Sequence, residues 1–174
     1  PAAELSIDSN PFKSALLAEP TGTPPKLAVK VDPKTSSALT FLRVLVVDDS
    51  EVNRFILCEL LGTLGIKATV ACNGEEAVAA FKHSTLDVIF MDIQMPVMDG
   101  VAATAAIKTL QSDQNFSPDC VIVGVSAHAM SGDREKYLAL GMSDYLTKPI
   151  DRKHLESCLS ALAKELRGDV HLWR

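Results

Sequence analysis

Residues 44–49 are Val44-Leu45-Val46-Val47-Asp48-Asp49, a short apolar run that ends in two carboxylates. The same order recurs along the chain: residues 88–91 precede Asp92, residues 121–125 precede Ser126, and residues 145–147 precede Lys148-Pro149. Continuous Val- and Ile-rich runs of this length are typical of parallel strands that helices cover on both faces. Because the carboxyl ends of parallel strands lie at one edge of a sheet, we expect five polar side chains to meet there: Asp48, Asp49, Asp92, Ser126 and Lys148.

Strands of this kind alternate with helical periods five times between Leu42 and Arg167. The predicted strands are 43–47, 67–71, 87–91, 120–125 and 144–147. The predicted helices are 51–63, 75–83, 100–111, 132–140 and 152–166. Asp99 and Asp151 stand just before two of these helices, where a carboxylate caps the first turn. Five βα units within residues 42–167 indicate an α/β fold with an open, doubly wound parallel sheet, because a βα-barrel needs roughly 200 residues or more.

The chain divides into a Pro-rich linker at its start, a folded domain and a short tail, with predicted boundaries 1–41, 42–167 and 168–174. Six of the nine prolines fall within residues 1–40, and such a composition favours a semi-rigid spacer. Within the linker, Asn10-Pro11 predicts the start of a short helix that carries Phe12, Leu16 and Leu17. Since the first residue is Pro1 rather than Met, we expect a fragment of a longer protein.

Composition and missing motifs exclude several classes of function. The chain carries 17 Lys and Arg against 22 Asp and Glu, and it has no basic stripe, so we expect no nucleic-acid partner. No apolar run approaches the roughly 18 residues of a membrane span, so we expect no membrane contact by this segment. The four cysteines form no CxxC pair, which favours reduced packing residues of a cytosolic domain over zinc or redox sites. Hydrolase triads and Gly-rich nucleotide loops are also absent.

The acidic residues at the strand ends indicate a metal site. Like charges as close as those of Asp48, Asp49 and Asp92 raise one another's pKa unless a cation neutralises them. Mg²⁺ prefers oxygen ligands and commonly binds one or two carboxylates together with a phosphate. Lys148 and the hydroxyl of Ser126 add groups that bind phosphoryl oxygens. A carboxylate can itself attack phosphorus, as in enzymes that form an aspartyl phosphate. These residues therefore favour Mg²⁺-dependent phosphoryl chemistry.

The motifs at these strand ends resemble a known family when they are taken together. They are Val46-Val47-Asp48-Asp49-Ser50, residues 91–100 (Met-Asp-Ile-Gln-Met-Pro-Val-Met-Asp-Gly), Val125-Ser126-Ala127 and residues 145–149 (Tyr-Leu-Thr-Lys-Pro). Their order and spacing over residues 42–167 resemble the receiver domain of two-component response regulators. The form Asp-Asp-Ser-Glu-Val-Asn-Arg at residues 48–54 is most similar to receivers attached to hybrid histidine kinases. The resemblance implies a flavodoxin-like sheet with strand order 2-1-3-4-5 and helices on both faces.

The resemblance also implies how the acidic residues divide their work. Asp92 would accept a phosphoryl group from a phosphohistidine. Asp49 and Asp92 would bind Mg²⁺ directly, together with the backbone carbonyl of Gln94, while Asp48 would act mainly through a bound water. Lys148 would pair first with Asp92 and later with the phosphoryl group. The implied partners are a histidine kinase, a histidine phosphotransfer domain, or both.

A second group of residues would make the switch in such a domain. Ser126 would move toward the phosphoryl oxygen, and Tyr145 would then turn inward, so that a local charge event biases a two-state element. Gln94 and His128 occupy the two variable positions that, in this family, set how fast water attacks the acyl phosphate. The resemblance further implies a cis peptide bond between Lys148 and Pro149, which only an X–Pro bond makes inexpensive.

The helix at 51–63 carries more apolar residues than one core-facing stripe requires. Leu57, Leu60, Leu61 and Leu64 form the core stripe, and Val52, Phe55 and Ile56 lie off it. Receivers of this kind bind a helical phosphotransfer domain there, so we expect these three residues to contact a partner. The alternatives are that the linker covers them or that they remain a small exposed patch.

Three further readings of the chain stay open at this stage. A metabolic Mg²⁺-dependent phosphohydrolase also uses a doubly wound sheet, but it places its nucleophile in an Asp-x-Asp motif after the first strand. A pseudo-receiver acts only by interaction and normally lacks Asp92 or Lys148. A stand-alone response regulator would share the receiver but not the kinase. We expect a cytoplasmic signalling module that catalyses its own phosphorylation and dephosphorylation, and that belongs to a hybrid sensor kinase.

Overall fold

The computed structural model describes residues 39–113, 120–127 and 133–166, which contain one five-stranded parallel sheet. Its strand order is β2-β1-β3-β4-β5, as the resemblance implied. The strands are β1 (Val44–Val47), β2 (Ala68–Ala71), β3 (Val88–Asp92), β4 (Val121–Ser126) and β5 (Asp144–Thr147). The helices are α2 (Glu51–Thr63), α3 (Gly74–His83), α4 (Gly100–Gln111), α5 (Asp133–Ala139) and α6 (Arg152–Leu166). The helix expected at Asn10-Pro11, the tail and His128 lie outside the described residues.

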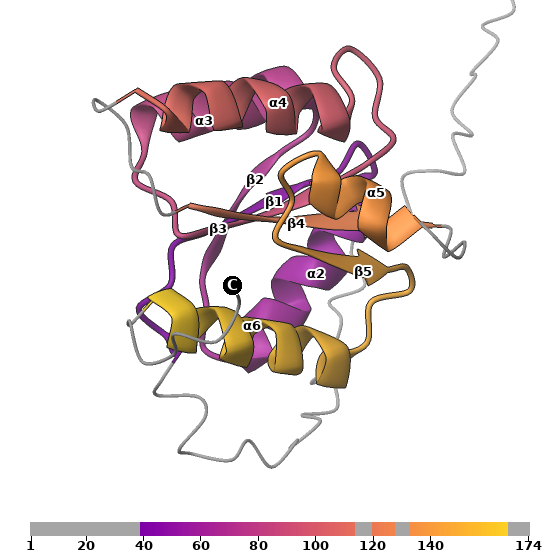
Figure 1. Ribbon diagram of the computed structural model, residues 1–174. Helices are drawn as coiled ribbons and strands as arrows, with labels where there is room; N and C mark the ends of the chain where they lie inside the picture. The colour runs from indigo at the N-terminus through magenta and orange to yellow at the C-terminus, as the bar shows by residue number, and fades with distance from the viewer. Residues whose placement is uncertain (1–38, 114–119, 128–132, 167–174) are drawn as a thin grey trace, which may run out of the picture. The chain divides into compact units, whose positions relative to one another are not determined.

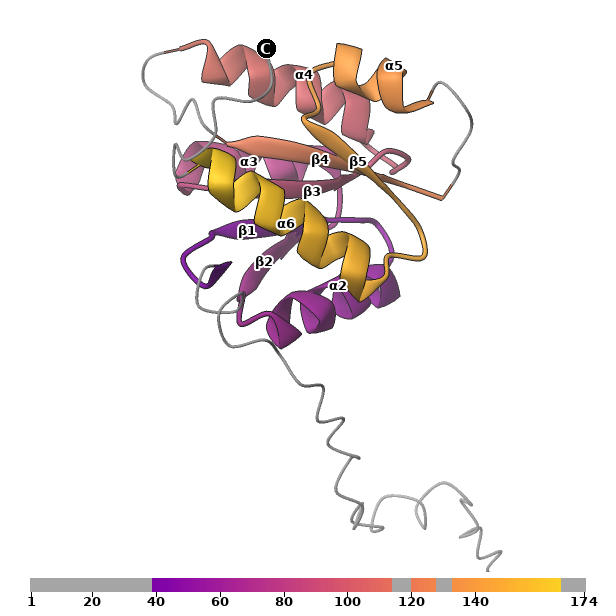
Figure 2. The ribbon, with the colours of Figure 1, turned by 60° about the horizontal axis from the view of Figure 1, so that its bottom comes forward.

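Helices cover both faces of the sheet (Figure 1), and alternate residues of each strand serve the two faces. Val44 and Val46 of β1 pack with the leucines of α2 and α6, in a cluster that also contains Phe90. Leu45 and Val47 point the other way, into a second cluster formed with α3, α4 and α5. Figure 2 shows α2 and α6 side by side on their face. The central strands are therefore buried on both sides, which explains their continuous apolar sequence.

Polar residues fix the starts of the helices that follow the strands. The hydroxyl of Ser50 accepts a hydrogen bond from the backbone N–H of Asn53 and caps α2. Asp99 accepts from the N–H of Ala102 at the start of α4, so it is a helix cap rather than a ligand, as the sequence predicted. Asp151 accepts from the N–H of His154 at the start of α6. Each of these caps fixes where the chain turns into its helix, after β1, β3 and β5.

Strands β3 and β4 begin and end one residue later than the sequence predicted. Asp92 pairs with Val125, and Ser126 pairs with Thr147, so both polar residues belong to their strands. The apolar runs end one residue earlier, but ladder hydrogen bonds involve the backbone and continue past the last apolar side chain. This places Asp92 and Ser126 on the sheet itself, where their backbones are held more firmly than in a loop.

The loop between β3 and α4 is folded tightly against Asp92. The N–H of Gly100 donates to the carbonyl of Ile93, and a Cβ at Gly100 would lie 2.0 Å from the Asp92 carbonyl oxygen. Only glycine allows the helix to start this close to the strand end. Val97, at the tip of the loop, has a φ of 70°, an uncommon value for a β-branched residue. The peptide bond between Lys148 and Pro149 is cis, as expected.

None of the helices in the described part of the chain combines the length and the apolar character that crossing a bilayer requires.

Candidate functional site

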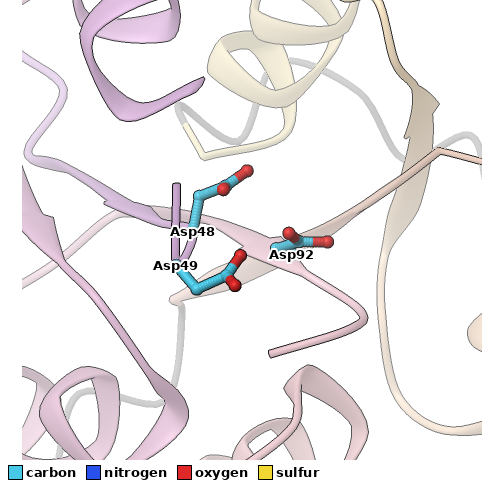
Figure 3. Close-up of side chains that lie close together, drawn as sticks. All are labelled: Asp48, Asp49 and Asp92. Atoms are coloured by element: carbon cyan, nitrogen blue, oxygen red, sulfur yellow. The ribbon is translucent and has the colours of Figure 1, made fainter. Parts of the chain in front are cut away.

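The carboxyl ends of β1 and β3 bring three carboxylates together, as the sequence predicted. Asp48 and Asp49 follow β1, Asp92 ends β3, and one oxygen of each lies within 4.8 Å of the other two. Figure 3 shows the three side chains close to one another. Asp48 and Asp92 are buried, whereas Asp49 is exposed. A set of oxygen donors of this size and charge fits Mg²⁺, which binds few protein carboxylates and keeps several waters.

Lys148 bridges two of the three carboxylates. Its Nζ lies 2.6 Å from Asp48 Oδ2 and 2.7 Å from Asp92 Oδ2. The sequence predicted the contact with Asp92 but not the one with Asp48. The backbone N–H of Lys148 also donates to the carbonyl of Ser126 at 2.8 Å, which fixes the lysine to the end of β4. One ammonium thus neutralises part of the negative charge at the site.

The site shifts the pKa values of its acid and its base upward. Burial raises the pKa of the Asp92 carboxyl, and the hydrogen bond from Lys148 counteracts this only in part. Burial works against the Lys148 ammonium, but its hydrogen bonds to Asp48 and Asp92 outweigh burial and raise its pKa. Lys148 therefore stays protonated at neutral pH. The ionised form of Asp92 depends on cations placed beside it.

Asp48 and Asp49 are adjacent in sequence but differ in what they bind. Asp48 Oδ1 accepts from the Ser50 N–H at 2.9 Å and from Asn53 Nδ2 at 3.1 Å, while Oδ2 faces Lys148. Among the described residues, the Asp49 carboxylate makes no hydrogen bond or ion pair, and it is exposed. Asp49 is thus free to bind an ion directly, whereas Asp48 is already held on both oxygens. The expected division between direct ligation by Asp49 and water-mediated ligation by Asp48 remains a prediction.

The remaining predicted residues lie at the same edge of the sheet or near it. Ser126 is buried at the end of β4. The backbone N–H of Gln94 donates to Asp92 Oδ1 at 3.3 Å, and its side chain is exposed. Tyr145 lies on β5 and stacks on Tyr137 of α5, with ring centroids 5.4 Å apart. The roles of Gln94 as a metal ligand and of Ser126 and Tyr145 as a switch remain predictions.

The apolar residues that lie off the core stripe of α2 are exposed, as expected. The exposed fractions are 64% for Val52, 64% for Phe55 and 49% for Ile56. Ile56 also lines a cavity of about 350 Å³ beside Asp48, Asn53 and Lys148, whose other walls are mainly apolar. The exposed face of α2 is therefore continuous with an apolar cavity that reaches Asp48 and Lys148.

Sequence reasoning missed one set of contacts at the site. Arg54 Nη1 donates to the backbone carbonyls of Asp48, at 2.6 Å, and Asp49, at 3.1 Å, and Asn53 holds the Asp48 side chain. The only signal in the sequence was polar residues five and six positions after Asp48. Such a spacing places them in the first turn of the next helix without showing where they point.

Comparison with known proteins identifies the family. Residues 44–160 match the family described as the response regulator receiver domain, so the chain belongs to this family of two-component signalling domains. Hybrid signal transduction histidine kinase G of Dictyostelium discoideum is 41% identical over 127 residues, which cover 72% of this chain and 4% of the kinase. Signal transduction histidine-protein kinase BarA of Escherichia coli is 39% identical over 127 residues, 73% of this chain and 13% of BarA. The chain therefore spans a small fraction of these relatives.

Two solved structures share both fold and sequence with the chain. One is the receiver domain of sensor histidine kinase PA1611 from Pseudomonas aeruginosa, which holds a magnesium ion in its active-site cleft. It is 34% identical, covers 70% of this chain and 97% of that one, and has a TM-score of 0.62. The other is a co-crystal structure of the Saccharomyces cerevisiae phosphotransfer protein Ypd1 with the receiver domain of Ssk1. It is 32% identical, covers 72% and 90%, and has a TM-score of 0.67.

Proposed function

We propose that Asp92 is the phosphoacceptor of this receiver domain and that it accepts its phosphoryl group from a phosphohistidine. The observation that supports this most directly is the position of its carboxylate. Asp92 lies at the end of a central strand, 2.7 Å from the Lys148 ammonium and within 4.8 Å of two further carboxylates. A carboxylate so placed has a fixed cation on one side and a cation site on the other.

In the proposed reaction, a carboxylate oxygen of Asp92 attacks the phosphorus of the phosphohistidine. A bond forms between that oxygen and phosphorus, the bond from phosphorus to the imidazole nitrogen breaks, and the nitrogen keeps the electron pair. Asp49 and Asp92 would hold Mg²⁺ with the Gln94 carbonyl, and Asp48 would act through water. The ion would supply charge neutralisation for the phosphoryl oxygens. Lys148 keeps its proton throughout, because its pKa is raised, and would move from Asp92 to a phosphoryl oxygen.

The proposed switch uses Ser126 and Tyr145. Ser126 ends β4 next to β3, and the backbone N–H of Ile93, which follows Asp92, donates to the Val125 carbonyl at 2.9 Å. A hydroxyl at this position is suited to donate to a phosphoryl group on Asp92. Movement of Ser126 would leave space beside β4 for Tyr145, which pairs with Gly124 across the ladder. The phosphoryl charge would thus be converted into a change at the surface around β5.

We further propose that Val52, Phe55 and Ile56 bind the partner that donates or receives the phosphoryl group. This face is apolar, exposed and continuous with the cavity that reaches Asp48 and Lys148. The structure that pairs Ypd1 with the Ssk1 receiver is an example of a related domain in complex with a histidine phosphotransfer protein. A helical phosphotransfer domain is therefore the partner that we expect.

The similarity to hybrid kinases supports a place for this domain in a hybrid sensor kinase. We expect this domain to be cytoplasmic. A stand-alone response regulator is the alternative, since it would have the same receiver fold and the same site. A non-phosphorylated pseudo-receiver is disfavoured, because Asp92 and Lys148 are both present and in contact. A metabolic phosphohydrolase is disfavoured because the proposed nucleophile, Asp92, ends β3 and does not follow β1.

Transfer from a histidine-phosphorylated phosphotransfer domain tests the donor and the docking face together. The label should move to the unaltered chain, and Phe55→Asp should slow this transfer roughly tenfold or more, as for the loss of an apolar interface anchor. Phosphorylation by a small-molecule phosphodonor should not change, since Phe55 does not touch Asp92. Leu140→Asp is the matched control, because Leu140 is another exposed apolar residue, at 40%, but it lies after α5 and not on α2. Equal slowing with both donors, or by both variants, would contradict the docking role.

A further inference from the structure

The first turn of α2 holds the loop that carries two of the three carboxylates. Arg54 Nη1 donates to the carbonyl oxygens of Asp48, at 2.6 Å, and Asp49, at 3.1 Å. Asn53 Nδ2 donates to Asp48 Oδ1 at 3.1 Å. Helix α2 therefore holds the loop at two kinds of group: Arg54 binds backbone carbonyls of the loop, and Asn53 binds the Asp48 side chain. Neither Asn53 nor Arg54 is one of the proposed metal ligands.

These contacts determine where the two aspartates point. With Oδ1 held by Asn53 and the Ser50 N–H, the Asp48 carboxylate presents Oδ2 to Lys148 and to the side of Asp92. With both carbonyls held by Arg54, the peptide between Asp48 and Asp49 cannot rotate without breaking a hydrogen bond. The Asp49 side chain makes no hydrogen bond to another described residue, so its direction depends on this backbone.

We infer that Asn53 and Arg54 are positioning residues for the Mg²⁺ site, acting through Asp48 and the Asp48–Asp49 backbone. The inference rests on the metal site of the proposed function and adds two residues to it. Partners of metal ligands commonly change metal affinity by roughly 10- to 100-fold when they are removed. The expected effect of losing either side chain is therefore a weaker Mg²⁺ complex in a domain that is still folded.

Because Arg54 is charged, the direction in which its removal changes the Mg²⁺ affinity distinguishes a positioning role from a purely electrostatic one. A guanidinium beside a cation site repels the cation, so removal of the charge alone would strengthen Mg²⁺ binding. Removal of its two hydrogen bonds would weaken binding, because the loop loses its orientation. The two effects have opposite signs, and the positioning role predicts that the second one dominates. Asn53 carries no charge, so its removal reports on positioning alone.

The test is calorimetric titration of the full 174-residue chain with Mg²⁺ alone. Arg54→Met and Asn53→Ala should each raise the Kd roughly tenfold. Arg54→Lys, which keeps the charge and one reachable donor, should recover part of the affinity. Lys67→Met is the control for a lost positive charge, because Lys67 is exposed and precedes β2, at the opposite edge of the sheet. Urea unfolding without metal verifies folding, and the milder Asn53→Ala keeps the test valid if Arg54→Met unfolds.

A kinetic readout separates positioning from general damage to the domain. In phosphorylation by a small-molecule donor, the Mg²⁺ concentration for half-maximal rate should rise in both variants, while the rate at saturating Mg²⁺ recovers. An unchanged or lower Kd in both variants would overturn the positioning role and leave the proposed phosphoacceptor intact. No Mg²⁺ binding by the unaltered chain would overturn the metal site and the positioning role together. Weaker Mg²⁺ binding by the variants, with no phosphorylation of the unaltered chain, would support positioning and overturn the phosphoacceptor.

Discussion

Substitution of Lys148 by Met tests the electrostatic account of the site. The Lys148 side chain is 21% exposed, and its ammonium lies between the side chains of Asp48 and Asp92, which are 6% and 7% exposed. Methionine fills a similar volume but carries no charge. The variant therefore leaves Asp48 and Asp92 facing each other without their cation, while the rest of the core is unchanged.

The expected cost follows from the burial of the two carboxylates. Removing one partner of a buried ion pair typically costs about 3 to 5 kcal/mol, and the partial exposure of Lys148 favours the lower end. We expect a loss of about 3 kcal/mol at neutral pH without Mg²⁺, or a fall in Tm of roughly 10 °C. Lys164→Met, on the exposed side of α6, is the matched control and should change the free energy of unfolding by less than about 0.5 kcal/mol.

The pH dependence of this loss has a defined sign. Burial raises the pKa of Asp92, and Lys148 opposes the rise, so removal of Lys148 raises the pKa further. A carboxyl whose pKa is higher in the folded state destabilises the fold as the pH rises through that pKa. The loss should therefore be small at a pH below the ordinary carboxyl pKa of 3.8, and it should grow as the pH rises through the raised pKa of Asp92.

Urea unfolding at several pH values, with and without Mg²⁺, measures both effects. Millimolar Mg²⁺ should restore part of the stability of Lys148→Met, because a bound cation replaces the missing one and stabilises the folded state by mass action. A loss that is equal at acid and neutral pH and is not reduced by Mg²⁺ would show that Lys148 acts by packing, and would refute this reasoning.

Further predictions concern the loop after β3 and the opposite edge of the sheet. Gly100→Ala should lower Tm by more than about 10 °C in thermal unfolding, because its Cβ would lie 2.0 Å from the Asp92 carbonyl oxygen; normal stability would contradict this. Val97→Gly should raise the free energy of unfolding by about 1 kcal/mol in urea, since Val97 is 75% exposed and holds a φ of 70°; a loss of stability would show that no strain is stored there. Asp87→Asn should cost about 2 kcal/mol at neutral pH, because Asp87 accepts three hydrogen bonds from Arg43. Those bonds hold the pKa of Asp87 below its usual 3.8, so the cost should disappear as the pH falls through that lowered value, and a cost that persists in acid would contradict it.

The order of strands and helices could be predicted because each element carries a local signal. Asp99 and Asp151 mark two helix starts, and the bounds of α2, α4 and α6 match the predicted ranges. Strand ends were less certain, since a continuous apolar run has no period to show where pairing stops. Backbone pairing added Asp92 and Ser126 to their strands.

The acidic cluster could also be predicted, because a parallel sheet brings its strand ends to one edge. The contacts within the cluster could not. The bridge from Lys148 to Asp48 and the bonds from Arg54 to two carbonyls depend on side-chain directions that only the packed structure fixes. The exposure of Phe55 was predictable from helical periodicity, whereas the cavity that Ile56 lines depends on how α2 meets the segment after β5.

Intact-mass measurement after incubation with acetyl phosphate and Mg²⁺ tests the central claim most directly. The account predicts a single phosphoryl adduct on the unaltered chain and none on Asp92→Asn or after Mg²⁺ is removed with a chelator. Asp99→Asn is the matched control, because Asp99 is a helix cap outside the cluster, and it should retain the adduct. An adduct that persists on Asp92→Asn, or no adduct on the unaltered chain, would contradict the assignment of Asp92 as the phosphoacceptor.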